Sequence, residues 1–254
     1  MIDLCPSSIT ANVKGMVVSE PADRNARYAI YWAPPDDSVL ARIGAAWLGR
    51  DAVTDRALPR PTVVGFDDAT LAALTAEPRR YGLHATLKPP FGLATAATVS
   101  ALEAALTEFA AATAPVVLPA LQVSRIGNFV ALVPAAPAPA VQALADACVA
   151  QFDAYRAPAS DDEVARRNAA GLTPAQRANL RRWGYPYVME EFRFHVTLTG
   201  PLEPATGNRL VPVLSALFAE VTAAPLAIDA LALFVEPGRG QPFRLRRRFA
   251  LGGR

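Results

Sequence analysis

Apolar and polar residues alternate through two short stretches of the chain, and each stretch runs into a proline. Residues 81–88 read Tyr-Gly-Leu-His-Ala-Thr-Leu-Lys and stop at Pro89-Pro90, while residues 192–199 read Phe-Arg-Phe-His-Val-Thr-Leu-Thr and stop at Gly200-Pro201. A period of two is typical of a strand with one buried and one polar face. Both stretches are therefore predicted to be strands.

The segments that follow these two strands repeat one order of elements: a helix rich in alanine and leucine, a proline, and an apolar hairpin. The interval from His84 to Pro115 is 31 residues, and that from His195 to Pro225 is 30. The two histidines are 111 residues apart. This repeat predicts two similar lobes related by a pseudo-twofold axis.

The other elements follow from periodicity and from cap residues. Ser38 and Gly49 bracket one helix, and Pro78 is expected to end another that Asp67 caps. A turn at Gly127 joins two of the strands, and residues 50–65 are expected to be loop. In all, we expect further strands at 28–32, 116–124, 128–133, 226–235 and 243–251, and helices at 39–48, 67–76, 97–112, 138–155 and 206–221.

The charged stretch 160–182 lies between the two halves and is too polar for a core. Ser160–Glu163 has the pattern of a capping box, and Thr173-Pro174 has that of a helix start, so we expect two short helices broken at Gly171. The charge pattern favours a surface elaboration over 160–187. A flap over a site is the alternative, because the stretch leads directly into the second histidine strand.

These elements predict an α+β fold of two pseudo-symmetric lobes, with antiparallel sheets, outer helices and an active-site cleft between the lobes. Residues 1–26 lack periodicity and are expected to be a flexible tail. Residues 27–251 are expected to form a single bilobal domain with one motif near 84 and the other near 195.

Composition narrows the classes of function. Hydrophobic residues make up 52% of the chain, enough for a packed core, and 25 basic against 23 acidic residues give a net charge of +2. That balance argues against an electrostatic binder of nucleic acid or of a membrane surface. No segment approaches the roughly 20 apolar residues of a membrane helix. The arginines of 244–248 fall on both faces of a strand, which indicates a solvated edge strand. We expect a cytoplasmic monomer with no membrane contact.

Cysteine and histidine are scarce. Cys5 and Cys148 have no metal-ligand spacing, and with two histidines in the whole chain a four-ligand zinc site is nearly excluded. We expect a reducing compartment, no metal and no cofactor.

Both histidines stand in the same pattern, His-x-Thr-Leu. Because side chains alternate along a strand, each strand would present an imidazole, a hydroxyl and a cation on one face. The expected sets are His84, Thr86 and Lys88 in the first strand, and Arg193, His195, Thr197 and Thr199 in the second. The alternative interpretation of each residue is structural. The histidines would be buried with their hydrogen bonds made, the threonines would be favoured as strand formers, Lys88 would be exposed to solvent, and Arg193 would pair with Glu190 or Glu191.

Two such strands facing each other would suit a phosphodiester. One neutral histidine would take a proton from water, and the other, protonated, would give one to the departing alkoxide. Thr86 and Thr197, with Lys88 or Arg193, would hold the non-bridging oxygens. Tyr81, Tyr185 and Tyr187 are candidates to stack on a base or sugar, with packing as the alternative.

Four stretches of the chain, 27–35, 79–91, 183–187 and 190–201, resemble the two-histidine phosphoesterase superfamily, which includes RNA-ligase-like cyclic phosphodiesterases. Within it they are similar to a bacterial branch named for phosphonate metabolism. The resemblance covers roughly residues 27–251. It implies two lobes with both motifs in one cleft, and its matched functional positions are His84, Thr86, His195 and Thr197.

The sequence thus predicts metal-independent hydrolysis of a small cyclic phosphodiester. The branch implies a cyclic phosphate of ribose such as phosphoribosyl 1,2-cyclic phosphate, and the elaboration at 160–187 means that the substrate need not be RNA. Which histidine is the acid stays open. One alternative is processing of RNA 2′,3′-cyclic phosphate ends, for which a long basic groove would be expected. Another is a non-catalytic module that binds a phosphorylated metabolite.

Overall fold

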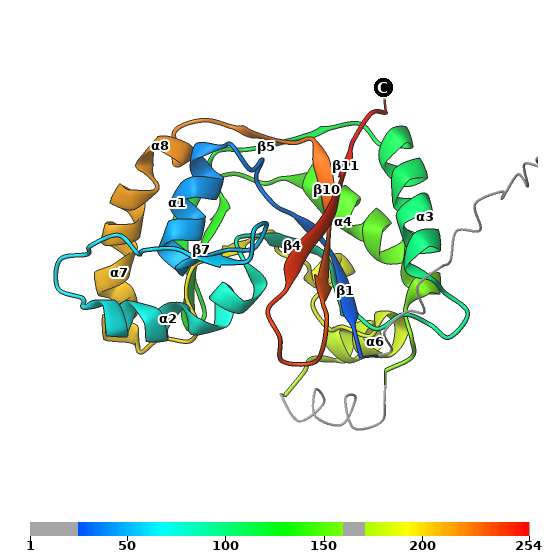
Figure 1. Cartoon of the computed structure of the whole chain (residues 1–254), viewed down its shortest axis with the longest axis horizontal. Coiled ribbons are helices and arrows are strands. Elements are labelled where there is room, and N and C mark those ends of the chain that lie inside the picture. Colours follow the sequence, from blue (N-terminus) through cyan, green and yellow to red (C-terminus); the bar gives the residue numbers. More distant parts are fainter. Residues whose placement is uncertain (1–24, 160–170, 254) are drawn as a thin grey trace, which may run out of the picture.

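The computed structural model describes residues 25–159 and 171–253, and its centre is a seven-stranded sheet (Figure 1). Every neighbouring pair in this sheet is antiparallel, so the predicted fold class is confirmed. The strand order is β11-β10-β1-β4-β8-β7-β6. The strands are β1 (Arg27–Trp32), β4 (Ala85–Phe91), β6 (Leu121–Ile126), β7 (Phe129–Pro134), β8 (Val196–Thr197), β10 (Ala230–Glu236) and β11 (Arg244–Ala250).

Equivalent positions of the repeat pair with each other at two places. β4 pairs with β8 through Ala85 and Val196, each of which directly follows the histidine of its motif. A separate pair joins β5 (Val116–Leu118) to β9 (Leu226–Ile228), the strands that follow the repeated proline. Antiparallel pairing of equivalent residues is what a twofold axis between two halves produces. The hairpins are exchanged: β6–β7 from the first half lies beside β8, and β10–β11 from the second lies beside β1.

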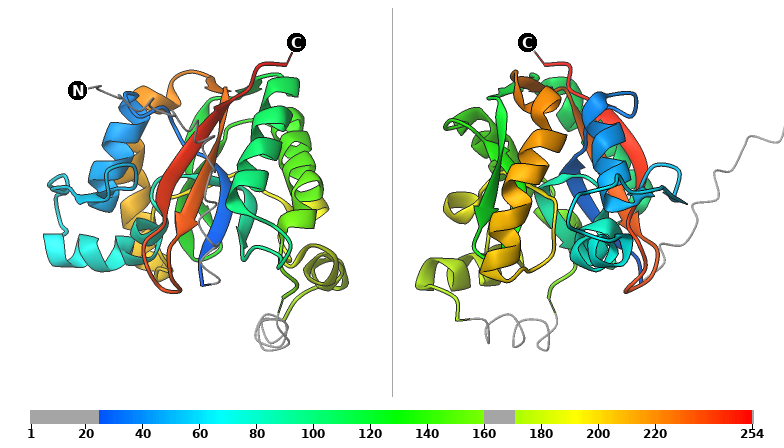
Figure 2. Two further views of the ribbon diagram at one scale, coloured as in Figure 1. Left: turned by 45° about the vertical axis from the view of Figure 1, so that its right-hand side comes forward. Right: turned by 90° about the vertical axis from the view of Figure 1, so that its left-hand side faces the viewer.

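The helices gather around this sheet (Figures 1 and 2). α3 and α4 lie side by side, α7 packs against β6 and β7, and α1 packs against α2. Two-residue strands β2 (Arg50–Asp51) and β3 (Arg56–Ala57) form a small hairpin inside the expected loop. Within the described residues the helices are α1 (Val39–Leu48), α2 (Asp68–Tyr81), α3 (Val99–Ala112), α4 (Pro139–Gln151), α6 (Pro174–Trp183), α7 (Pro204–Leu217) and α8 (Ala219–Thr222), with single turns η1 (Asp153–Tyr155) and η2 (Met189–Glu191).

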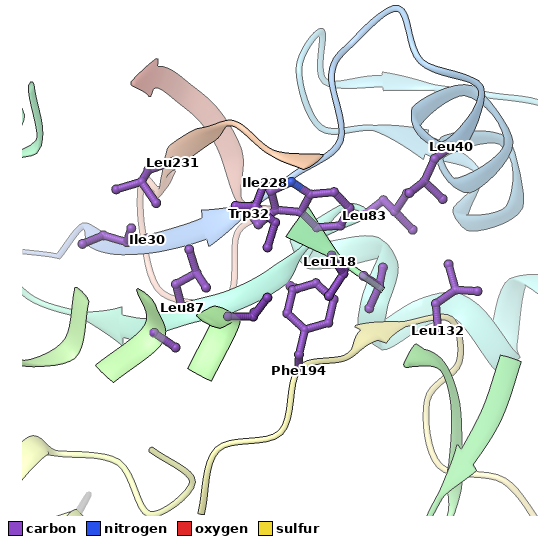
Figure 3. Packing of buried hydrophobic residues seen from close by; sticks show 14 of the residues in the cluster. Ile30, Trp32, Leu40, Leu83, Leu87, Leu118, Leu132, Phe194, Ile228 and Leu231 are labelled. Carbon is purple, nitrogen blue, oxygen red and sulfur yellow. The ribbon is translucent and has the colours of Figure 1, made fainter. Parts of the chain in front are cut away.

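One face of the sheet carries the main hydrophobic core, to which both halves contribute. Trp32 of β1 lies 5.8 Å, between ring centroids, from Phe194, and Leu118 packs beside them (Figure 3). Buried residues of α1, α3, α4 and α7 belong to the same cluster. The opposite face holds a smaller cluster that includes Tyr31 and Phe243.

The helix caps follow the local sequence signals. The Ser38 hydroxyl accepts a hydrogen bond from the Ala41 N–H at 3.1 Å, and Gly49 ends α1 in the left-handed conformation. Thr173 starts α6 with a reciprocal capping box to Gln176. These predictions are confirmed because caps depend on residues within one helical turn. The predicted capping box at 160–163 and residues 1–24 of the predicted tail lie outside the described residues.

The prediction that Pro78 ends its helix is wrong, because α2 continues to Tyr81. A proline inside a helix deprives the carbonyl four residues earlier of its donor and typically costs about 3 kcal/mol. That carbonyl belongs to Leu74, and it accepts instead from the Gly200 N–H at 2.8 Å. A residue that follows the second motif thus satisfies the helix that precedes the first.

Other boundaries also differ from the prediction. β4 begins at Ala85, after its histidine, and continues through Pro89-Pro90 to Phe91, while β8 is limited to two residues. The predicted strand 116–124 is divided at Pro119-Ala120, because β5 pairs with β9 whereas β6 pairs with β7. The predicted elements 138–155, 206–221 and 226–235 are likewise each divided in two, into α4 and η1, α7 and α8, and β9 and β10.

We expect Trp47→Phe to destabilise the fold more than Trp32→Phe. Both indoles are buried, but the Trp47 Nε1–H donates to the Leu198 carbonyl at 2.7 Å, whereas the Trp32 Nε1–H has no partner among the described residues. Losing a partner for a buried carbonyl costs about 1–3 kcal/mol beyond the loss of ring volume. Urea unfolding of both variants measures this difference, and equal losses would contradict the role of the hydrogen bond.

Candidate active site

Both histidines and both threonines of the repeated motif line one cavity of about 400 Å³. The cavity lies on the sheet face opposite the main core, and α2 forms one of its walls. Residues far apart in the sequence therefore meet at one place. The lining residues are Arg27, Tyr31, Glu77, Pro78, Tyr81, His84, Thr86, Pro89, Pro90, Phe129, Tyr185, His195, Thr197, Thr199, Gly200 and Pro201.

The two imidazoles are held in the same way. The Nδ1 atom of His84 lies 2.9 Å from the Gly82 carbonyl, and that of His195 lies 2.7 Å from the Arg193 carbonyl. A carbonyl can only accept, so Nδ1 carries the hydrogen in each ring. Nε2 of each neutral histidine is therefore left as an acceptor. The repeat has placed two proton acceptors in one cavity.

Gly82 fixes the carbonyl that orients His84. Its φ of +76° lies in the region that favours glycine, and a Cβ atom there would meet the Ala52 Cβ at 2.4 Å. The chain can make this tight change from α2 to the motif only with glycine. The same residue ends α2, so helix end and imidazole orientation depend on one backbone conformation.

Aromatic rings surround both imidazoles. The Tyr31 ring stacks on His84 at 3.9 Å, and the Phe129 ring lies 5.7 Å from His195. Burial lowers the pKa of His84 to about 4, with a further lowering by nearby His195, and burial lowers the pKa of His195 as well. Burial raises the pKa of Tyr31, which keeps its hydroxyl neutral. In the free protein both imidazoles are neutral at pH 7.

Arg27 supplies the cation of the cavity. Its Nε donates to the buried carboxylate of Glu236 at 2.5 Å, and Arg80 donates to the other oxygen of that carboxylate. Burial alone would raise the pKa of Glu236, but the hydrogen bonds from the two arginines outweigh it and lower that pKa. Glu236 therefore stays ionised and orients Arg27.

The prediction that Lys88 shares the motif face is wrong. Ile30 of β1 pairs with Lys88 and Tyr31 pairs with Thr86, so β4 has one extra residue, Leu87, between these pairs. This β-bulge turns the next side chain to the core side of the sheet. The Lys88 ammonium is buried and donates to the Val149 carbonyl at 3.0 Å.

Some of the other predicted residues line the cavity and others lie outside it. Tyr81 and Tyr185 line the cavity, although Tyr81 comes from α2 rather than from a strand. The Arg193 side chain is exposed and outside the lining, so only its carbonyl takes part. Thr199 lines the cavity but is buried, where it accepts from the Val130 N–H and donates to the Gly200 carbonyl. Tyr187 is exposed and lies outside the cavity.

Arg27, Tyr31 and Glu77 are cavity residues that the sequence analysis did not single out. Alternation along β1 puts Arg27 and Tyr31 on one strand face, which is a usable signal. This signal does not predict that the face meets the histidines. Only the strand order of the sheet, which puts β1 beside β4, brings them together. Glu77 reaches the cavity from α2, directly before Pro78.

A protein family described as "Protein of unknown function (DUF1045)" matches residues 86–244. The chain belongs to this family. The chain is 40% identical over 231 residues to ribose 1,5-bisphosphate phosphokinase PhnN of Janthinobacterium sp. (strain Marseille), covering 89% of this chain and 51% of that protein. It is 39% identical over 221 residues to the protein of that name from Laribacter hongkongensis (strain HLHK9), covering 87% and 51%. This DUF1045 chain thus spans about half the length of these relatives.

Two solved structures align with the DUF1045 chain along most of its length. Escherichia coli LigT complexed with 3′-AMP has a TM-score of 0.41 at 15% identity, covering 89% of this chain and 97% of that one. A phosphoesterase has a TM-score of 0.38 at 15% identity, covering 89% and 98%. Among the described residues, no helix combines the length and apolar character needed to cross a membrane.

We expect NMR titration to show two imidazole signals, both with a pKa below 6.5 and one of them near 4. The chain has two histidines, so His84→Gln assigns both resonances. Added inorganic phosphate should raise both pKa values, because an anion in the cavity favours imidazolium. Free-protein pKa values at or above 6.5 would contradict the burial of the rings.

Proposed function

We propose that this chain hydrolyses a small cyclic phosphodiester by acid–base catalysis between its two histidines. The observation that carries the proposal is the pair of equally oriented imidazoles in one cavity, each with Nδ1 bound to a carbonyl and Nε2 left to exchange a proton. Two groups that hand on protons from two halves of a cavity fit a reaction in which water is deprotonated and an alkoxide is protonated.

One neutral histidine accepts a proton from water as the water oxygen bonds to phosphorus. The ester P–O bond of the ring breaks, and the departing alkoxide takes the proton of the other histidine, which leaves a phosphomonoester and a hydroxyl. Thr86 and Thr197 donate hydrogen bonds to the non-bridging oxygens, and Arg27 supplies positive charge as negative charge builds there. The protons and charge are handled by these side chains, and no step calls for a metal ion.

Burial keeps both imidazoles neutral in the free protein, and nearby His195 further disfavours the charged form of His84, so the pair is not expected to carry two protons at once. A phosphodiester anion in the cavity would raise the pKa values of both histidines, so substrate binding favours protonation of the histidine that acts as the acid. The apparent pKa values of activity therefore belong to the coupled pair.

The finer proposal is that the substrate is a cyclic phosphate of ribose, such as phosphoribosyl 1,2-cyclic phosphate. The name of the relatives refers to a phosphorylated ribose as the molecule on which those longer proteins act. The same name also describes a kinase. The lysines of this chain do not match the P-loop pattern of kinases, because neither Lys14 nor Lys88 follows a glycine and precedes a serine or threonine. We therefore propose that this chain hydrolyses a cyclic phosphate of ribose.

His84→Ala and His195→Ala should each lower kcat/KM for ribose 1,2-cyclic phosphate and for a 2′,3′-cyclic nucleotide by about 10²–10⁴-fold, the usual contribution of a positioned proton donor or acceptor. Turnover by the unsubstituted chain should persist in EDTA. Arg247→Gln, a change of an exposed residue on β11 outside the cavity, is the control. Undiminished turnover in both alanine variants would overturn the mechanism.

We expect a bell-shaped pH profile whose kcat/KM maximum lies below pH 6.5. The active pair carries one proton, and burial lowers the pKa of both histidines in the free protein, so a rise in pH removes that proton. The kcat profile should shift to higher pH, because bound substrate favours imidazolium. Steady-state rates from pH 4 to 8 measure both profiles, and coincident profiles would contradict stabilisation by the bound anion.

The same substrate set tests the alternatives. RNA end processing would give a strong preference for oligonucleotides with 2′,3′-cyclic ends and salt-sensitive RNA binding. A non-catalytic module would bind the cyclic phosphates without turnover.

A further inference from the structure

A second cavity, of about 200 Å³, adjoins the two-histidine cavity and is lined by three arginines. Arg27, Arg156 and Arg239 line it, and they come from β1, from the residue after η1, and from the turn before β11. The two cavities share Arg27 and Pro90. A volume below the roughly 300 Å³ of pockets for whole small molecules suits one end of a ligand.

Among the residues that the structure describes, two carboxylates near this cavity each meet two cations. Glu236 is shared by Arg27 and Arg80. Asp153 is shared by Arg156, at 2.8 Å, and by the buried Lys88, at 3.6 Å. The single negative charge of each carboxylate therefore neutralises only one of its two cationic partners. Counted over these described groups, positive charge is left over on both sides of the cavity.

Arg239 adds to this surplus. Its side chain is exposed at the cavity, and it makes no hydrogen bond or ion pair within the described part of the chain. Its neighbour Gly240 donates its N–H to Glu236 at 3.0 Å, which ties the turn to the carboxylate that holds Arg27. An unpaired guanidinium beside two anchored ones is an arrangement that receives a multiply charged anion.

The position of Arg156 is fixed by its surroundings. Its Nε donates to Asp153, and its Nη2 donates to the Arg182 carbonyl at 3.3 Å. Gly184 leaves room for the guanidinium, because a Cβ atom there would meet the Arg156 Nη1 at 2.9 Å. This arginine is held at the cavity wall before any ligand arrives, so binding costs little side-chain ordering.

We propose that this cavity, lined by Arg27, Arg156 and Arg239, binds a terminal phosphomonoester of the same molecule whose cyclic diester lies between the histidines. The inference rests on the proposed function for the reacting end, while the anion site itself stands on the three arginines. Arg27 links the two ends, since it borders both cavities. The substrate class is then a sugar that carries a cyclic phosphate and a second, dianionic phosphate.

Binding tests the site without turnover. Ribose 5-phosphate should bind more tightly than ribose or inorganic phosphate in isothermal titration calorimetry, and Arg239→Gln should weaken it by about 10- to 100-fold, the usual contribution of a hydrogen bond to a charged group. Arg156→Gln should act in the same direction. His84→Ala with His195→Ala should still bind, so loss of catalysis and loss of this site are separable. Arg239 is the cleaner variant because it supports no other described residue.

Arg247→Gln, an exposed arginine outside both cavities, is the matched control and should bind as the unsubstituted chain does. Binding that is insensitive to Arg239→Gln and Arg156→Gln would overturn the proposal. Equal weakening by Arg247→Gln would also overturn it, as a general charge effect. Inorganic phosphate that binds as tightly as ribose 5-phosphate would show an anion site unrelated to the substrate.

Kinetics test the link between the two ends. Adenosine 2′,3′-cyclic phosphate with and without a 5′-phosphate provides a pair that differs in one dianion. The ratio of kcat/KM should favour the phosphorylated member, and Arg239→Gln should lower this ratio by about 10- to 100-fold. Hydrolysis of both members with an unchanged ratio would support the proposed function and overturn the second site. Absence of hydrolysis with arginine-dependent binding of ribose 5-phosphate would do the reverse.

Discussion

The pairing of β4 with β8 is the constraint on which the rest of the structure depends. It joins Ala85 to Val196, the residues that follow the two histidines, across the pseudo-twofold axis. Side chains one position before a paired residue lie on the opposite sheet face from it, so both imidazoles project away from the main core. The core beneath is built from both halves, and Trp32 and Phe194 contact each other there. The fold and the convergence of the histidines thus have one cause.

The electrostatics of the cavities follow from burial. Both imidazoles are neutral because charged rings would lose their hydration, whereas Glu236 stays ionised because two arginines satisfy it. The β-bulge also turns Lys88 to the core side of the sheet, where it shares Asp153 with Arg156. Burial lowers the pKa of Lys88 to about 8, so it is protonated in most molecules at pH 7. The result is two adjoining cavities, one that holds the neutral imidazoles and one that is lined by three arginines.

Local strain and helix geometry shape the wall. α2 passes Pro78 because Gly200 donates to the carbonyl that the proline leaves free, and the residues that follow the proline bring Tyr81 to the cavity. Gly82 then turns the chain sharply and presents its carbonyl to His84. Helix, turn and imidazole are coupled across the two motifs, so the site is assembled only when both halves have folded together.

The sequence by itself determined the features that depend on near neighbours: the α+β class, the two His-x-Thr-Leu motifs, the repeat, and the caps at Ser38 and Thr173. Periods of two and of about 3.6, and cap hydrogen bonds, are set within a few residues. Tertiary structure alone decided which way Lys88 faces, since a bulge reverses alternation and depends on the register with β1. It also decided that Arg27 meets the histidines and that α2 passes Pro78, because each requires a partner from a distant segment of the chain.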